Sequence, residues 1–172
     1  MQMVKRIFGG FFLALILLWL FSPKQELYYL LEKELKKKHI IISNETFKDK
    51  WIGFEISNAD IYIEGAKMAK IEKLTFNFFL FYNSIDIKTI KINDAFKNMA
   101  PNMINHVNAT YSVLKPLKAK LIANGSFGVM NGEVDIVKRK INLRFPVAKD
   151  IKTFKRFLRK DKIKGWYYEK TY

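Results

Sequence analysis

The stretch WIGFEISNADIYIEGAKMAKIEKLTFNF, residues 51–78, alternates apolar and polar side chains over most of its length. Successive side chains of a β-strand point to opposite faces, so this period of two predicts strands that share one apolar face. Glycine and asparagine residues punctuate the runs, as expected between short antiparallel strands. The alternating apolar positions are Ile52, Phe54, Ile56, Leu74, Phe76 and Phe78.

The same period continues on both sides of this stretch. It predicts further strands at 39–43, 85–92, 117–123, 141–145 and 166–168. In 85–92 the apolar parity switches after Ile87, which predicts a bulge or strong twist near Thr89. Asn131-Gly132 tolerates positive φ, and it predicts a type I′ turn in a hairpin over 127–137. The predicted architecture is therefore an antiparallel meander with one apolar face.

Three segments have helical periodicity. In 24–38, Leu27, Leu31 and Leu35 recur every four residues, and this amphipathic helix either lies on lipid head groups or caps the sheet. Residues 94–115 predict a helix with Asp94 at its N-cap, divided at Pro101, whose apolar stripe contains Met103, Val107 and Tyr111. Residues 149–160 predict a basic helix with Ile151, Phe154, Phe157 and Leu158 on one side.

Residues 7–23 contain no charged side chain and follow Lys5-Arg6. A helix of this length spans about 25 Å, near the lower limit for a bilayer core. An uncleaved membrane anchor is favoured over a cleaved secretory signal, because no small-x-small cleavage pattern follows, and over a buried core helix. The predicted anchor residues are Ile7, Phe8, Phe11, Phe12, Leu13, Leu15, Ile16, Leu17, Leu18, Trp19, Leu20 and Phe21.

These elements predict an α+β fold: an N-terminal transmembrane helix, an amphipathic helix, and a curved, mostly antiparallel sheet with flanking helices. The expected localisation is the bacterial inner membrane, single-pass, with the C-terminal domain in the periplasm. The predicted segments are a cytoplasmic N-terminus (1–6), an anchor (7–23), the amphipathic helix (24–38), a sheet-rich periplasmic domain (39–148), and a basic C-terminal helix and tail (149–172).

The chain of 172 residues carries a net charge of +15, and residues 138–172 hold 13 Lys and Arg against 3 Asp and Glu. This concentration predicts contact with anions: lipid or protein surfaces are favoured over nucleic acid, and a solvated basic face is an equal alternative. In the nucleic-acid alternative Trp166, Tyr167 and Tyr168 stack on bases. The candidate anion-contacting residues are Lys138, Arg139, Lys140, Lys152, Lys155, Arg156, Arg159 and Lys160.

The sequence contains no pattern typical of catalysis. It has no cysteine, its two histidines are His39 and His106, and it lacks metalloprotease, phosphate-loop and nucleophile-elbow motifs. Gly125-Ser126-Phe127-Gly128 lies between two predicted strands, so a bulge in a hairpin is expected there. We therefore expect no catalytic residue, no metal and no cofactor.

The order of segments resembles a known group of proteins. Phe21-Ser22-Pro23 leads into the 24–38 helix, followed by GFEISNADIYI (53–63), IEKLTF (71–76), FFLF (78–81), ANGSFG (123–128) and GEVDI (132–136). This pattern resembles the type II secretion system protein N group and the wider AsmA-like envelope proteins. The resemblance implies a curved periplasmic sheet and a non-enzymatic role in envelope assembly, secretion or lipid handling.

Three functions follow as hypotheses. The first is an accessory or scaffold subunit of an envelope-spanning assembly that docks protein partners at its sheet edges. The second is an AsmA-like lipid-binding module, whose acyl-chain contacts are Ile52, Phe54, Leu74, Phe76 and Phe78, although these side chains also fit an ordinary core. The third is membrane-tethered nucleic-acid binding through the basic C-terminus.

Overall fold

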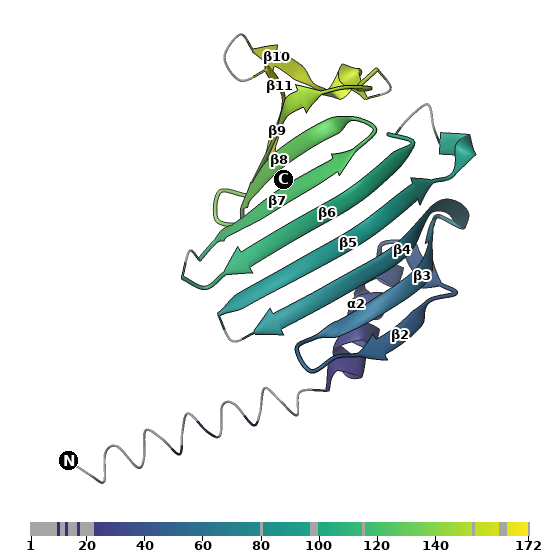
Figure 1. The fold of residues 1–172 in the computed structure, drawn as a ribbon, viewed down its shortest axis with the longest axis vertical. Helices are drawn as coiled ribbons and strands as arrows, with labels where there is room; N and C mark the ends of the chain where they lie inside the picture. The colour runs from purple at the N-terminus through teal and green to yellow at the C-terminus, as the bar shows by residue number, and fades with distance from the viewer. Residues whose placement is uncertain are drawn as a thin grey trace, which may run out of the picture.

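The computed structural model describes residues 10, 13, 17, 23–79, 81–96, 100–114, 116–152, 154–161 and 165–171. The described elements are helix α2 (Lys24–Lys37), two 3-10 turns (Asp94–Phe96 and Lys155–Phe157) and the strands of one large sheet (Figure 1). The strands are β1 (Ile40–Ser43), β2 (Thr46–Asp49), β3 (Phe54–Ile63), β4 (Ala66–Phe79), β5 (Tyr82–Ile92), β6 (Met103–Ser112), β7 (Lys118–Gly125), β8 (Gly128–Asp135), β9 (Lys140–Ala148), β10 (Arg159–Asp161) and β11 (Gly165–Thr171).

The strands form an 11-stranded antiparallel sheet in the order β1-β3-β4-β5-β6-β7-β8-β9-β11-β10, with β2 also paired to β3. From β3 to β9 each strand pairs with the next one along the chain, which confirms the predicted meander. The sheet twists, so that Figure 1 shows β4 to β7 face-on and β9 and β11 nearly edge-on.

Helix α2 packs against the N-terminal end of this sheet, on the side facing away from the viewer in Figure 1. The predicted amphipathic helix is therefore confirmed, and of its two expected positions it takes the one on the sheet. Its buried residues are Lys24 and Tyr28, 8% and 3% exposed, whereas Leu27 and Leu31 of the predicted leucine stripe are exposed and Leu35 is half-buried. The helix is oriented with Tyr28 towards the sheet, because the tyrosine ring packs there against both Phe47 and Phe54.

The predicted fold class is wrong in two respects. The chain is mostly antiparallel sheet, and no helix in its described part is long and apolar enough to cross a membrane. α2 has 14 residues, spans about 21 Å, and carries acidic and basic side chains. The predicted single-pass inner-membrane localisation and transmembrane helix depended on residues 7–23, and they are corrected together with the fold class. Apart from Gly10, Leu13, Leu17 and Pro23, that segment lies outside the described residues.

The predicted helix at 94–115 is also wrong. Among the described residues of this range, Asp94–Phe96 forms a 3-10 turn and Met103–Ser112 is strand β6, paired with β5 and β7. Met103, Val107 and Tyr111 recur every four residues, and four residues is close to one helical turn but also two strand periods. The sheet neighbours on both sides satisfy the backbone of β6, so the strand prevails over the helix.

The predicted turn at Asn131-Gly132 does not occur. Both residues lie inside β8, where Asn131 pairs with Ile122 and Arg144, and Gly132 pairs with Leu121 and Leu143. The chain reverses instead at residues 126–127 and 136–139. Gly125–Gly128, where a bulge was expected, forms the β7–β8 turn instead: the two glycines pair with each other, and residues 126–127 connect them.

Residues 149–160 do not form the predicted basic helix. Their described part contains one 3-10 turn at Lys155–Phe157, and Arg159–Asp161 is strand β10. Backbone hydrogen bonds from Lys149 N to Phe127 O (2.9 Å) and from Asp150 N to Ser126 O (3.3 Å) hold the start of the segment to the β7–β8 turn. These bonds tie residues 149–158, termed the cap segment below, to the sheet in an irregular path.

Two predictions about strand irregularity can be compared directly. Thr89 has φ 53° and is skipped in the pairing of β5 with both neighbours, so the backbone is irregular where a bulge or strong twist was predicted, but the register of the strands does not shift there. Asn58 (φ 59°) was expected to separate two strands, but it lies within the single strand β3 as a residue skipped in its pairing with β4. Both positions let the apolar parity change without ending the strand.

Candidate functional site

Cross-strand register places the apolar residues of successive strands in continuous rows on one face. Residues directly opposite each other in antiparallel strands point to the same side. One row runs Phe54, Phe76, Ile85, Ala109, Leu121, Gly132, Leu143 and Tyr168, from β3 to β11. The next row runs Ile56, Leu74, Ile87, Val107, Ala123 and Met130. The sheet therefore presents an apolar face across almost its whole width.

This apolar face is covered at its two ends. At the N-terminal end α2 contributes Tyr28 to a core with Phe54, Ile56, Ala59 and Ile71. At the C-terminal end the cap segment contributes Ile151 to a second core. The other buried residues of that core are Ala123, Phe127 and Phe145.

The apolar face is hollowed where the half-buried side chains around these two cores leave space uncovered, the larger hollow lying against the C-terminal core. One hollow of about 300 Å³ has an apolar wall drawn from β6 to β9 and the cap segment. A second of about 210 Å³ lies over β4 to β7. Leu121 lines the first and its cross-strand neighbour Ala109 lines the second, so the two hollows adjoin. The first is lined by Pro101, Ile104, Val107, Leu121, Ala123, Phe127, Met130, Phe145 and Phe154.

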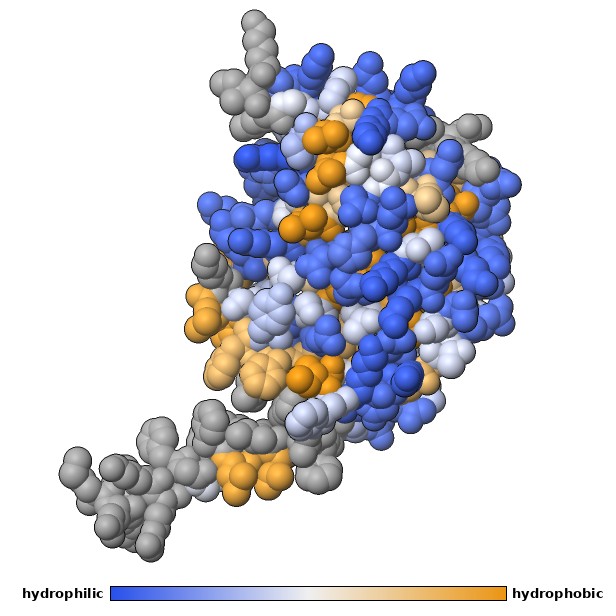
Figure 2. All heavy atoms as spheres, viewed as in Figure 1, coloured by the Kyte–Doolittle hydropathy of each residue, from blue (hydrophilic) through white to orange (hydrophobic). Residues whose placement is uncertain are grey.

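The opposite face of the sheet is polar, and it is the face seen in Figure 2. On it His106 Nε2 lies 2.6 Å from Asp86 Oδ2, and Asn108 Nδ2 donates to the same oxygen at 3.4 Å. Burial opposes ionisation of Asp86, but the hydrogen bonds from His106 and Asn108 outweigh it and lower the pKa of that carboxyl. Glu55 accepts from Lys50 and Lys73, which lower its pKa to about 2. The partners of Asp86 and Glu55 thus compensate the negative charges of these two carboxylates on the polar face.

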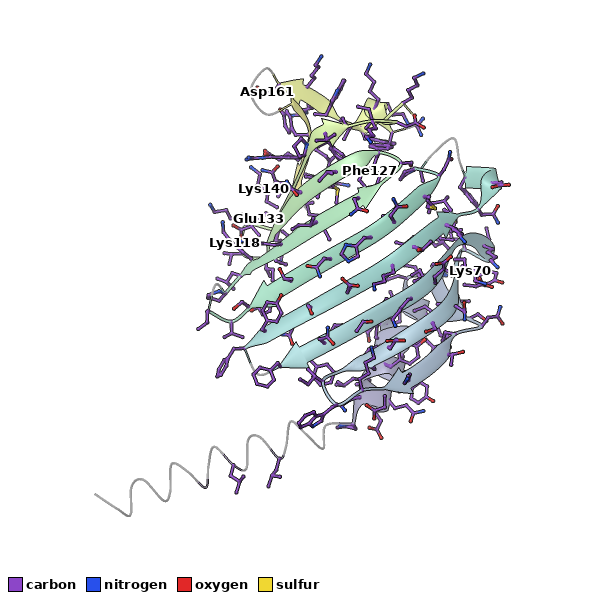
Figure 3. All side chains as sticks on the ribbon, viewed as in Figure 1. Lys70, Lys118, Phe127, Glu133, Lys140 and Asp161 are labelled. Carbon is purple, nitrogen blue, oxygen red and sulfur yellow. The ribbon has the colours of Figure 1, made fainter. Side chains whose placement is uncertain are left out.

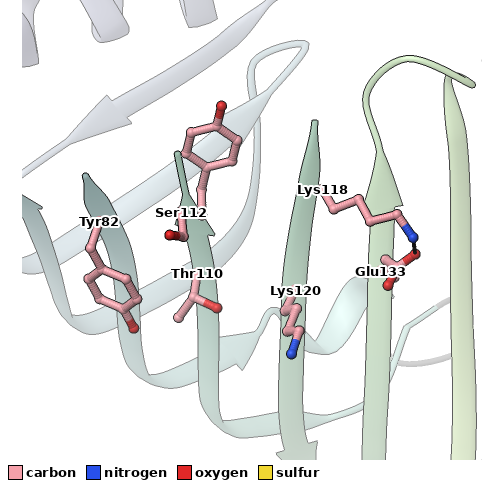
Figure 4. A pocket seen from close by; sticks show the side chains of 7 residues that line it. Tyr82, Thr110, Ser112, Lys118, Lys120 and Glu133 are labelled. Atoms are coloured by element: carbon pink, nitrogen blue, oxygen red, sulfur yellow. Dashed lines mark hydrogen bonds and ion pairs between the residues drawn. The ribbon is translucent and has the colours of Figure 1, made fainter. Parts of the chain in front are cut away.

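A hollow of about 460 Å³ lies on the polar face at one end of β5 to β8 (Figure 4). Lys118 Nζ pairs with Glu133 Oε1 at 2.8 Å across it. All of its charged side chains are exposed, and the described residues include no group of three His, Asp or Glu side chains that could hold a metal ion. The remaining side chains labelled there are Tyr82, Thr110, Ser112 and Lys120.

The predicted anion-contacting residues separate into two groups. Lys138, Arg139 and Lys140 lie at the β8–β9 turn, where Lys140 pairs with Glu169 at 2.8 Å. The others lie in the cap segment and β10, beyond the opposite end of β9 (Figure 3). Within this second group Lys155 and Lys160 converge on Trp166 of β11. The second group is Lys152, Lys155, Arg156, Arg159 and Lys160.

The predicted lipid-facing or core residues also divide. Phe54 is buried in the N-terminal core, and Leu74, Phe76 and Phe78 are half-buried against it. Ile52 lies in the β2–β3 bend, 40% exposed. Of the predicted anchor residues, Leu13 and Leu17 are described and exposed, and the rest lie outside the described residues.

Sequence reasoning missed the central part of the apolar face. Val107 and Ala109 were assigned to a helix, and Met130, Leu143 and Phe145 were not considered for a site. The alternation of Val107, Ala109 and Tyr111 with polar residues was the available signal. Comparison with protein-family models, curated proteins and solved structures gives no match, so the resemblance to envelope proteins remains a prediction.

Proposed function

We propose that this protein binds a lipid acyl chain on the apolar face of its sheet, in the two hollows over β4 to β9. The observation that carries this proposal is the pair of adjoining apolar hollows over β4 to β9. Proteins rarely leave a contiguous apolar surface of this kind open unless it serves for binding. An extended acyl chain fits the two rows of side chains on this face, because each row crosses the strands without a polar interruption.

The alternative is that these side chains form only a hydrophobic core. That explanation fits Phe54 and Ile56, which are 3% and 2% exposed beneath α2. It fits Val107, Ala109 and Leu121 less well, because they are half-buried and line open hollows. The two explanations therefore apply to different parts of one face, and binding is proposed for the central part alone.

The experiment is a titration of the full-length protein with 1-lauroylglycerol below its critical micelle concentration, followed by calorimetry. Leu121→Asp places a charge in the central hollow, and we expect it to weaken binding by about tenfold or more. Ile122→Asp is the matched control, because Ile122 is the next residue of β7, 50% exposed and on the polar face. Absence of binding by the unmodified protein, or equal loss in both variants, would refute the proposal.

A second candidate function is docking of a protein partner at the β1 edge of the sheet. β1 reads Ile-Ile-Ile-Ser, Ile41 is 41% exposed, and this edge strand contains no proline or charge to discourage pairing. Glu64 N donates to His39 O, so the N–H of Ile41 faces β3 and the N–H groups of Ile40 and Ile42 face the free edge. Ile42→Pro removes a backbone donor from the edge, whereas Ile42→Thr retains it. We expect only the proline variant to lose a partner that copurifies with the protein; an equal yield of the partner in both would contradict this function.

A further inference from the structure

Two lysines share one aromatic ring at the C-terminal end of the sheet. Lys155 Nζ lies 5.1 Å and Lys160 Nζ lies 5.6 Å from the ring centroid of Trp166. In the described part of the chain neither forms an ion pair with a carboxylate. Like charges held near one ring repel each other, and cation–π attraction offsets this only in part. The pair therefore favours a bound anion.

The ring beneath these lysines adjoins the central apolar hollow. Trp166 pairs directly with Phe145 of β9, and both pack in the C-terminal core. Phe145 and Phe154 line the hollow of about 300 Å³, and Phe154 immediately precedes Lys155 in the cap segment. The two cations consequently lie beside one end of the apolar hollow.

We propose that the ligand is a single-chain amphiphile with an anionic head group, which Lys155 and Lys160 bind while the chain lies in the hollow. This inference rests on the proposed function and specifies its substrate class. An anion between two lysines gains two charge-assisted contacts and relieves their mutual repulsion. The hollow is at the lower end of the range of ligand pockets, which suits one chain rather than a bulky group.

Two other ligands for these cations are less consistent with the geometry. Base stacking requires a free aromatic face, but Trp166 packs against the C-terminal core and both lysines lie within cation–π distance of its ring. A free inorganic anion would use the lysines alone and would leave the adjoining hollow empty. The amphiphile is the ligand that uses both features together.

The experiment compares dodecyl phosphate, 1-lauroylglycerol and inorganic phosphate on the full-length protein by calorimetry. The Lys155→Gln/Lys160→Gln variant is expected to bind dodecyl phosphate roughly tenfold more weakly and 1-lauroylglycerol unchanged. The control variant Lys48→Gln/Lys88→Gln removes the same charge from exposed positions on β2 and β5, and it should change neither affinity. Lys155→Arg/Lys160→Arg retains the charge and should retain binding.

The outcomes separate the two proposals. If neither lauryl ligand binds, the proposed function fails and this inference fails with it. If both bind but the glutamine variant affects neither, or the control variant weakens dodecyl phosphate equally, only the head-group assignment is overturned. Binding of inorganic phosphate as tightly as dodecyl phosphate would also overturn it, because the chain would then contribute nothing.

Discussion

Leu143 of β9 lies over Gly132 of β8, and its side chain occupies the space that a larger residue at 132 would need. A Cβ added to Gly132 would lie 2.7 Å from Leu143 Cδ2 and 3.2 Å from Leu121 Cβ. The glycine therefore allows two leucines from neighbouring strands to approach each other across β8. This packing, rather than a turn, is the structural reason for glycine at this position.

The first prediction concerns this glycine. Gly132→Ala is expected to lower the free energy of unfolding by about 1–3 kcal/mol, because the new methyl group overpacks against both leucines. Asn131→Ala, at the exposed neighbouring position, should change it by less than about 0.5 kcal/mol. Urea unfolding measures both values. The cost should shrink when Leu143→Val is added, and an unchanged cost would disprove the packing explanation.

The second prediction concerns the attachment of α2. Tyr28 is buried against Phe47 and Phe54, and its hydroxyl donates to Glu45 Oε1 at 2.8 Å. Tyr28→Ala should cost about 3–5 kcal/mol, as expected for removal of a buried aromatic ring. Tyr29→Ala is the matched control because Tyr29 is 54% exposed. Equal losses in the two variants, measured by thermal or urea unfolding, would mean that α2 does not depend on this contact.

The third prediction concerns acid stability. Hydrogen bonds from Lys50 and Lys73 lower the pKa of Glu55 from 4.5 to about 2. On acidification the Glu55 carboxyl is therefore protonated at a higher pH in the unfolded chain than in the folded protein. The ionised carboxylate stabilises the folded state by about 1–2 kcal/mol, after allowance for the partly exposed lysines. This stabilisation is complete above pH 4.5 and is lost as the pH falls towards 2. Glu55→Gln should make the free energy of unfolding less dependent on pH over this interval. Glu64→Gln, at the exposed β3–β4 turn, should leave the dependence as it is.

The fourth prediction concerns the smaller apolar hollow. Ala109→Phe fills the space between Ile85 and Leu121, its neighbours across the sheet, and should reduce binding of 1-lauroylglycerol by about tenfold. Ile122→Phe adds a ring at an exposed position of the polar face that lines neither hollow, and it should leave binding intact. Calorimetric titration compares the two variants. Full binding by Ala109→Phe would restrict the site to the larger hollow.

Local sequence pattern was sufficient where one periodicity dominated. The strands around Phe54, Phe76 and Leu121 follow directly from alternation, and the irregular backbone at Thr89 follows from the change of parity there. Helix α2 was evident from its leucine spacing, but the residue that attaches it, Tyr28, was not. Helix periodicity identifies an apolar side, whereas the fit between rings decides which side chain is buried.

The candidate site depended on contacts that no local pattern contains. The four-residue spacing of Met103, Val107 and Tyr111 fits one helical turn and two strand repeats alike, so only pairing with β5 and β7 decides between them. Lys155 and Lys160 were two members of a basic run until the fold placed both beside Trp166. The sequence by itself determined the strands that have one clear apolar alternation, and the excess of positive charge, because these depend on residue type and spacing. The tertiary structure alone decided which apolar residues remain uncovered and which cations meet, because those depend on distances between strands far apart in the chain.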